Sequence, residues 1–250
     1  MHGVGAAAFL TGSGVLAGVI GTAGGITSLV AYPALLAVGV PPLAANVSSS
    51  VALLGSGASS ALRAGPDVRG HAATLWRWVP LMVVGSAAGA VLLVLTPTGL
   101  FDRLVPFLVL TGAVLLLLQP RVSRWQGDRG RRPARTTVTA AGGLVALYNG
   151  YFGAGSGILV IALLALTVEP VLRRANAVKN VLLVLADLLP AALFAVLGSV
   201  VWRAALPLGL GAVIGGLIGP SVARRLPERA LRVFVGACGV GLAVYLYVRA

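Results

Sequence analysis

The sequence predicts an all-α, polytopic integral membrane protein. Of its 250 residues, 58% are hydrophobic and only 10% are charged, whereas a soluble domain has about 25% charged residues. Its apolar runs, such as residues 79–95 and 105–118, are long and continuous, unlike the alternating strands of a membrane barrel. Since a spanning helix needs about 20 residues, we expect about 8–10 membrane helices, counting broken ones.

The positive charge is distributed as expected for a membrane protein. A net charge of +13 in a soluble protein would indicate nucleic-acid binding. Here, 16 of the 19 basic residues lie in four short regions between apolar runs, at 63–77, 120–135, 169–179 and 223–232. By the positive-inside rule these regions face the cytoplasm. We therefore predict a multi-pass protein of the cell (inner) membrane, with a cytoplasmic 120–135 loop and no nucleic-acid partner.

The chain divides into two similar halves, which we predict to be inserted in opposite senses. Each half has a broken hairpin followed by three helices, and the basic regions fit only if each hairpin leaves and returns. The sequence leaves open whether the hairpins are re-entrant or fully spanning. Such an inverted-topology repeat is a common plan of secondary transporters. The predicted elements are residues 6–38, 43–62, 78–95 and 100–119 of repeat 1 (1–119), and residues 136–168, 175–197, 204–222 and 230–248 of repeat 2 (136–250).

Two glycine clusters interrupt the hairpins. Most of the 34 glycines are interpreted as sites of close helix packing, but these clusters lie at predicted breaks. Unwound backbone at membrane depth occurs only inside protein or beside a cavity, and the helix N-termini exposed there attract anions. Thr27 and Ser28 could add further hydroxyl groups. We predict substrate-binding residues at Gly21, Thr22, Gly24 and Gly25, and at Gly153, Gly155, Ser156 and Gly157.

A polar stripe follows each hairpin on the next helix. Helix 43–62 carries Asn46, Ser49 and Ser50, and helix 175–197 carries Asn176, Lys179 and Asn180. We predict that these residues also bind substrate. Two alternatives stay open: the hydroxyls could form hydrogen bonds between helices, and Lys179 could extend to the cytoplasmic interface.

Asp187 is an acidic residue inside a predicted span, among leucine and alanine residues. A carboxylate at membrane depth is costly and usually functional. We predict that it couples proton movement or pairs with a cation, either Lys179 or an arginine of another helix.

No enzyme class fits the residue inventory. Ala154-Gly155-Ser156-Gly157 is similar to an intramembrane serine protease motif, but Ala154 stands where that motif has glycine, and no histidine follows His71. His71 itself lies outside the spans, so we expect it to be solvated. The sequence shows no metal-ligand cluster. We therefore predict no enzymatic activity, no cofactor and no metal.

The glycine clusters resemble the TauE/SafE family of sulfite and organosulfonate exporters. The resemblance rests on Gly18-Val-Ile-Gly21-Thr-Ala-Gly24-Gly25, the Gly39-Val-Pro41-Pro42 turn and Ala44-Ala45-Asn46, with Gly150-Tyr-Phe-Gly153-Ala-Gly155-Ser-Gly157 and Arg174-Ala175-Asn176 in the second half. Ala165 departs from it, where the first half has Pro33. The resemblance implies passive or proton-coupled movement of small sulfur-containing anions across a bacterial inner membrane, usually as export.

The expected function is a secondary transporter for a small anion of the sulfite or organosulfonate class. It would work by alternating access, as an exporter and with proton coupling, in contact with its substrate and the lipid bilayer. The alternatives are a non-transporting membrane scaffold or sensor, and a carrier of an unrelated small anion. The sequence leaves the substrate, direction, coupling ion and oligomeric state open, with a homodimer as one option.

Overall fold

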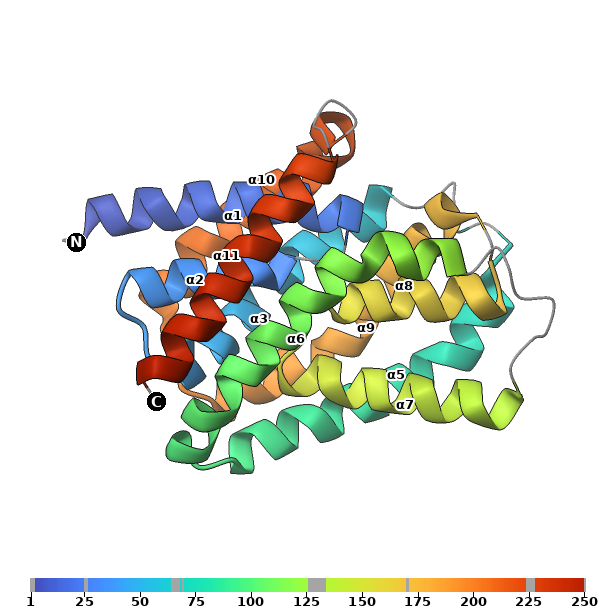
Figure 1. Ribbon diagram of the computed structural model, residues 1–250, viewed down its shortest axis with the longest axis horizontal. Helices are drawn as coiled ribbons and strands as arrows, with labels where there is room; N and C mark the ends of the chain where they lie inside the picture. Colours follow the sequence, from blue (N-terminus) through green and yellow to red (C-terminus); the bar gives the residue numbers. More distant parts are fainter. Residues whose placement is uncertain are drawn as a thin grey trace.

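A computed structural model describes residues 3–24, 27–63, 68, 70–125, 134–169, 171–223 and 228–249, and the regular structure in this part of the chain is helical. The all-α fold class is thereby confirmed. The helices, shown in Figure 1, are α1 (Val4–Gly24), α2 (Thr27–Ala37), α3 (Pro42–Arg63), α5 (Ala72–Leu95), α6 (Thr98–Trp125), α7 (Arg135–Tyr151), α8 (Ser156–Thr167), α9 (Leu172–Leu197), α10 (Trp202–Ala223) and α11 (Glu228–Arg249).

Several helices are suited to a bilayer. Among the described residues, five are long and apolar enough to cross a membrane, namely α1, α5, α6, α9 and α10, and α11 has a shorter apolar segment, Val235–Val248. The 22-residue α3 is not among the five, because its serines lower its hydropathy. It packs against α9 and α10. The helices α2 and α8, of 11 and 12 residues, are about 17 Å long, roughly half a bilayer core.

Some helix ends differ from the sequence-based expectation. The helix predicted to start at residue 78 begins at Ala72, and α6 continues through Pro120 to Trp125. The first residues of the expected 120–135 loop are therefore helical, because proline can bend a helix without ending it. The second break was expected at residues 149–157 but covers only 152–155, where Gly153 and Gly155 have φ values of 74° and 78°.

The helices pack in matching pairs. Helix α1 packs along α10 as α7 packs along α5, and α10 contacts α3 as α5 contacts α9. Glycines allow the closest pairs: a Cβ atom at Gly18 would lie 2.4 Å from the Ala212 carbonyl oxygen, and one at Gly89 would lie 2.1 Å from that of Leu147. Small residues that bring helix backbones together are typical of membrane interfaces.

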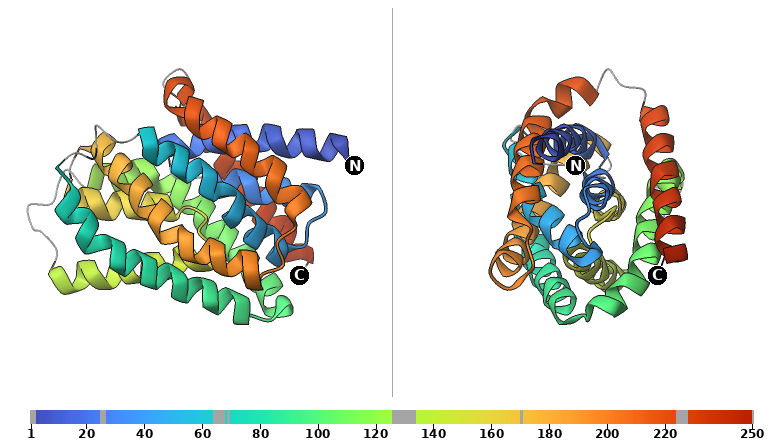
Figure 2. Two further views of the ribbon diagram at one scale, coloured as in Figure 1. Left: turned by 180° about the vertical axis from the view of Figure 1, so that it is seen from behind. Right: turned by 90° about the vertical axis from the view of Figure 1, so that its left-hand side faces the viewer.

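The two broken hairpins approach each other inside the molecule. In Figure 1, α1 starts at the end that carries the N-terminus and α7 starts at the opposite end, so the two run in opposite directions. The end-on view in Figure 2 shows α2 and α8 enclosed by the longer helices. The Ser28 hydroxyl donates a hydrogen bond to the Gly153 carbonyl oxygen at 3.4 Å. The start of α2 in one half therefore contacts the break between α7 and α8 in the other.

Candidate functional site

A polar pocket of about 120 Å³ lies beside the start of α2 and the break between α7 and α8. Helices α2, α3, α7, α8 and α9 contribute to its lining, and α1 contributes through Gly21. Nine residues predicted from the sequence to form the site line this pocket. They are Gly21, Ser49, Ser50, Gly153, Ser156, Gly157, Lys179, Asn180 and Asp187.

The break between α7 and α8 directs a helix N-terminus at the pocket. The Tyr148 hydroxyl donates to the Ala154 carbonyl oxygen at 2.7 Å and so stabilises the unwound segment. Helix α8 then starts with Ser156 and Gly157, which both line the pocket. The N–H groups of Ser156 and Ile158 donate to the carbonyl oxygens of Gly153 and Gly155 at 3.1 and 3.0 Å, but this end of the helix dipole is positive. This part of the lining therefore favours negative charge.

The other break places the start of α2 at the same pocket. Thr27 and Ser28 line it, together with Gly21 from the end of α1. Only glycine fits at position 21, since a Cβ atom there would lie 1.8 Å from the Thr27 hydroxyl oxygen. Two further predicted residues, Thr22 and Gly24, belong to the last turn of α1. The predicted Gly25 lies outside the described residues.

The serines of α3 use their hydroxyl hydrogens within their own helix. Ser49 and Ser50 donate to the Asn46 carbonyl oxygen at 2.8 and 3.0 Å, and Ser60 donates to that of Ser56 at 2.8 Å. Such bonds to the preceding turn are common for serine in helices. These pocket hydroxyls thus present lone pairs to the cavity, and each would have to rotate before it could donate to an anion.

Three predicted residues, Asn46, Gly155 and Asn176, are not among those that line the pocket. The Asn46 side-chain amide donates to the carbonyl oxygen of Tyr151, the last residue of α7, at 3.0 Å, and so satisfies an acceptor that the helix end leaves free. Gly155 packs on the backbone of α6, where its Cβ atom would lie 3.3 Å from the Cα of Gly112. Asn46 and Gly155 therefore shape the second break from outside the cavity.

Lys179 is the only lysine in the chain, and it is 2% exposed while lining the pocket. It does not extend to the interface, which was one of the two sequence-based interpretations. No described residue forms a hydrogen bond or an ion pair with its ammonium group. A buried charge without a partner is costly, so the pocket favours an anionic occupant.

Asp187 is hydrogen-bonded to an amide rather than paired with a cation. Asn149 donates from Nδ2 to Asp187 Oδ1 at 2.6 Å, and Ser156 donates to Asn149 Oδ1 at 2.6 Å. The predicted pairing with Lys179 is not seen among the described residues, because eight residues of helix separate the two by about 12 Å along α9. Asn149 was missed as a site residue, although a polar residue at the start of the glycine cluster is a signal that could have identified it.

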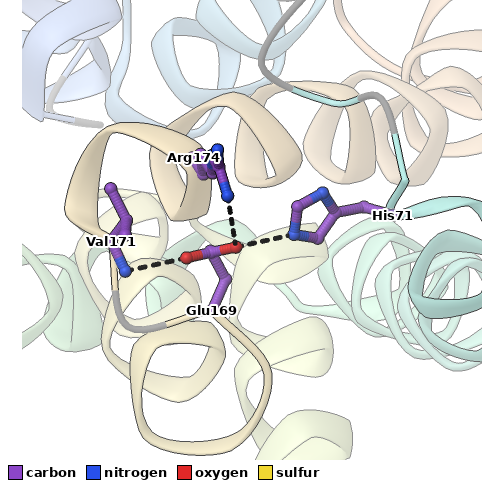
Figure 3. Close-up of polar contacts among 4 residues, drawn as sticks. All are labelled: His71, Glu169, Val171 and Arg174. Atoms are coloured by element: carbon purple, nitrogen blue, oxygen red, sulfur yellow. Dashed lines mark hydrogen bonds and ion pairs between the residues drawn. The ribbon is translucent and has the colours of Figure 1, made fainter.

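A second polar cluster, shown in Figure 3, joins the start of α5 to the connection between α8 and α9. His71 Nε2 lies 2.9 Å from Glu169 Oε2, the Val171 N–H donates to Glu169 Oε1 at 2.9 Å, and Arg174 approaches Glu169 at 4.0 Å. The Val171 N–H, followed by His71 and Arg174, lowers the pKa of Glu169 against the opposing effect of burial. The expectation that His71 is solvated is wrong, since its side chain is only 13% exposed.

Paired half-helices that meet at a central polar pocket define a class of protein. Discontinuous helices whose N-termini face a buried site are typical of secondary transporters. The chain belongs to the family described as sulfite exporter TauE/SafE, which matches residues 6–246. The protein is accordingly a multi-pass membrane transporter rather than an enzyme.

Curated relatives agree with this assignment. The chain is 27% identical to "Probable membrane transporter protein ORF9" of Sinorhizobium sp over 96% of this chain and 91% of that protein. It is 25% identical to a "Probable membrane transporter protein" of Haemophilus influenzae, over 89% and 87% of the two chains. It is 24% identical to "Probable membrane transporter protein YfcA" of Escherichia coli K12, over 88% and 82%. No solved structure matches the chain.

Proposed function

We propose that the protein is a secondary carrier for a small sulfur-containing anion of the sulfite or organosulfonate class. The observation that carries this proposal is Lys179, a buried cation that lines a polar pocket and has no hydrogen-bond or ion-pair partner among the described residues. An anion that enters the pocket supplies the missing partner, and its release restores the empty site. The sulfur-containing class and the export direction come from the description of the family.

The lining of the pocket supports recognition of a small anion. Its volume of about 120 Å³ is well above the roughly 10–15 Å³ that one water molecule needs. The Lys179 ammonium, the Asn180 amide and the N-terminus of α8 provide donors and positive potential. Leu183 and Phe194 form part of an apolar wall, which suits the carbon portion of an organosulfonate. Asn46, Asn176 and Gly155 then act by shaping the site rather than by binding.

Alternating access is the transport mechanism that we propose. The pocket takes α2 and α3 from one half of the chain and α7, α8 and α9 from the other, so a rocking of one half against the other would change its exposure. The matched packing of α1 with α10 and of α7 with α5 supports an inverted repeat. Asp187 would bind the coupling proton, since a neutral carboxyl group is cheaper at membrane depth than an ionised one.

The proposed orientation puts the basic segments, including residues 120–135, in the cytoplasm of a bacterial cell with the protein in its inner membrane. A cysteine-labelling experiment tests it. Val171 is exposed and lies between α8 and α9, so Val171→Cys in a Cys238→Ser background gives one labelled site. Labelling only from the cytoplasmic side is expected, and labelling only from outside would contradict the orientation.

Flux in proteoliposomes tests the transport function itself. Sulfite, thiosulfate, sulfoacetate and taurine would each be offered with and without a pH gradient, to wild type and to Asp187→Asn. We expect flux of at least one anion above that of protein-free vesicles, accelerated by a pH gradient in wild type alone. The absence of flux for every anion would favour a membrane scaffold or sensor. Equal pH-driven flux in both proteins would remove Asp187 from the mechanism.

A further inference from the structure

Three side chains connect the partly buried carboxylate of Asp187, on α9, to the N-terminus of α8. Asn149, near the end of α7, donates from Nδ2 to Asp187 at 2.6 Å and to the Ser86 hydroxyl oxygen at 3.2 Å. Its Oδ1 accepts a hydrogen bond from Ser156, the first residue of α8, at 2.6 Å. Both N–H groups and the oxygen of the Asn149 amide are therefore in use, and the amide lies between Asp187 and one end of the pocket.

The ionised carboxylate of Asp187 fixes the direction of each hydrogen bond from Asp187 through Asn149 to Ser156. A carboxylate only accepts hydrogen bonds, so the Asn149 NH₂ group must face Asp187 and its oxygen must face Ser156. The Ser156 hydroxyl then donates its hydrogen to Asn149. In this state Ser156 offers only lone pairs to the pocket, and these repel an anion at the N-terminus of α8.

Protonation of Asp187 permits the opposite arrangement. The carboxyl group then has an O–H donor, which the amide oxygen of Asn149 can accept if the amide turns over. Nδ2 would then donate to the Ser156 oxygen, and the Ser156 hydrogen would be free to donate to an anion. Ser86, which donates to the Ala146 carbonyl oxygen at 3.1 Å, could turn its hydroxyl toward Asn149 Oδ1 and give the turned amide oxygen a second donor.

We propose that Asn149 is a relay that couples proton binding at Asp187 to anion binding at Ser156. The proposal rests on the proposed function, because it explains how a carrier of this kind would move a proton together with its anion. No covalent bond changes: Asp187 takes a proton from solution, the amide turns, and Ser156 gains a free donor. Since linkage is reciprocal, the anion raises proton affinity as much as the proton raises anion affinity.

Few charged groups face Asp187. Lys179 is the other charged side chain that lines the pocket among the described residues, and it lies about two turns away on α9. From α7, α5 and α8 the residues in this network are the neutral Asn149, Ser86 and Ser156. Helix α3, which also packs against α9, lines the pocket with neutral serine, leucine and glycine residues. Lys179 acts on a bound anion directly, so the relay accounts for the part of the pH dependence that is lost when Asn149 is replaced.

Binding to purified protein in nanodiscs tests the relay. Thiosulfate is the first probe, because its charge does not change between mildly acidic and neutral pH, and sulfoacetate is the second. Wild type should bind more tightly as the pH falls, by about tenfold, which is typical of one added hydrogen bond to a charged group. Asn149→Leu keeps the shape of the side chain and should lose the tightening that depends on Asp187, so its affinity should change less with pH than that of wild type. Ser156→Ala should lose the tightening at acidic pH.

Two controls make the result specific. Thr139→Ala removes an exposed hydroxyl from α7 and should retain the wild-type pH dependence. An unchanged pH dependence in Asn149→Leu, or its absence from wild type, would overturn the relay. Failure of wild type to bind either anion would instead contradict the carrier function.

Infrared difference spectra of an acid titration test the relay without any anion, and without a substitution at Asn149. Wild type should show a protonated carboxyl band and a shifted side-chain amide band with the same midpoint, and Asp187→Asn should lack both. A carboxyl band without the amide shift would overturn the relay.

Discussion

Replacing Lys179 with methionine should weaken anion binding without destabilising the protein. Methionine keeps an unbranched apolar side chain of similar length but removes the ammonium group. A hydrogen bond to a charged group contributes about 1.5–3 kcal/mol, which corresponds to a loss of roughly 10- to 150-fold in affinity. Because Lys179 is 2% exposed and its ammonium has no partner in the part of the chain that the structure describes, its removal also relieves a desolvation cost. The thermal midpoint of the anion-free protein should therefore stay constant or rise.

Equilibrium binding of thiosulfate and thermal unfolding of the same preparations measure both effects. Arg203→Met, which removes an exposed cation at the start of α10, is the matched control and should leave affinity unchanged. Lys179→Arg keeps the charge and should bind better than Lys179→Met. Wild-type affinity in Lys179→Met would refute the assignment of Lys179 to the site. A large fall in its thermal midpoint would show that the ammonium stabilises the fold instead.

Three further substitutions test the packing and the polar cluster. Gly89→Leu should prevent close packing of α5 on α7, since even a Cβ atom would lie 2.1 Å from the Leu147 carbonyl oxygen. Gel filtration should then show loss of monodisperse protein. The control Gly12→Ala, at a position in open space, should stay monodisperse. Gly155→Ala places an alanine in a left-handed backbone conformation, at φ 78°, and should lower the free energy of unfolding by about 1–2 kcal/mol. The thermal midpoint should fall, and an unchanged midpoint would contradict the strain. Glu169→Gln should lower stability by about 1–2 kcal/mol at neutral pH. Because the pKa of Glu169 is lowered in the folded state, the stabilisation by its carboxylate is complete above the ordinary glutamate pKa and disappears as the pH falls through the lowered value. A stability difference between Glu169→Gln and wild type that grows toward acidic pH would contradict this role of Glu169.

The predicted site residues that line the pocket follow from the energetics of the membrane interior. An ion or an unwound backbone at membrane depth needs a special environment, and few such features occur in this apolar chain. The pocket therefore contains Lys179, Asp187 and the glycines of both breaks. Their order in the sequence was enough to assign these residues to one site, because in each half a glycine break is followed by a helix that carries a polar stripe.

The parts that were missed depend on how neighbouring helices align. Asn46 reaches the end of α7 rather than the pocket, and Asn149 faces Asp187 across a helix interface. Neither contact has a sequence signal, since each needs the rotation and height of two helices at once. Similarly, only the folded chain brings Glu169 to His71. The end of α6 was misplaced for a local reason, because the helix continues past Pro120 and proline does not always end a helix.

Counterflow measures the central claim most directly, namely that one buried anion site is exposed alternately to the two sides of the membrane. Proteoliposomes loaded with unlabelled anion would be diluted into a trace of the same anion carrying a radiolabel. A carrier should accumulate label transiently above its external concentration, and Lys179→Met should do so only at higher anion concentrations. Label that only equilibrates, at a rate independent of the anion inside, would contradict alternating access.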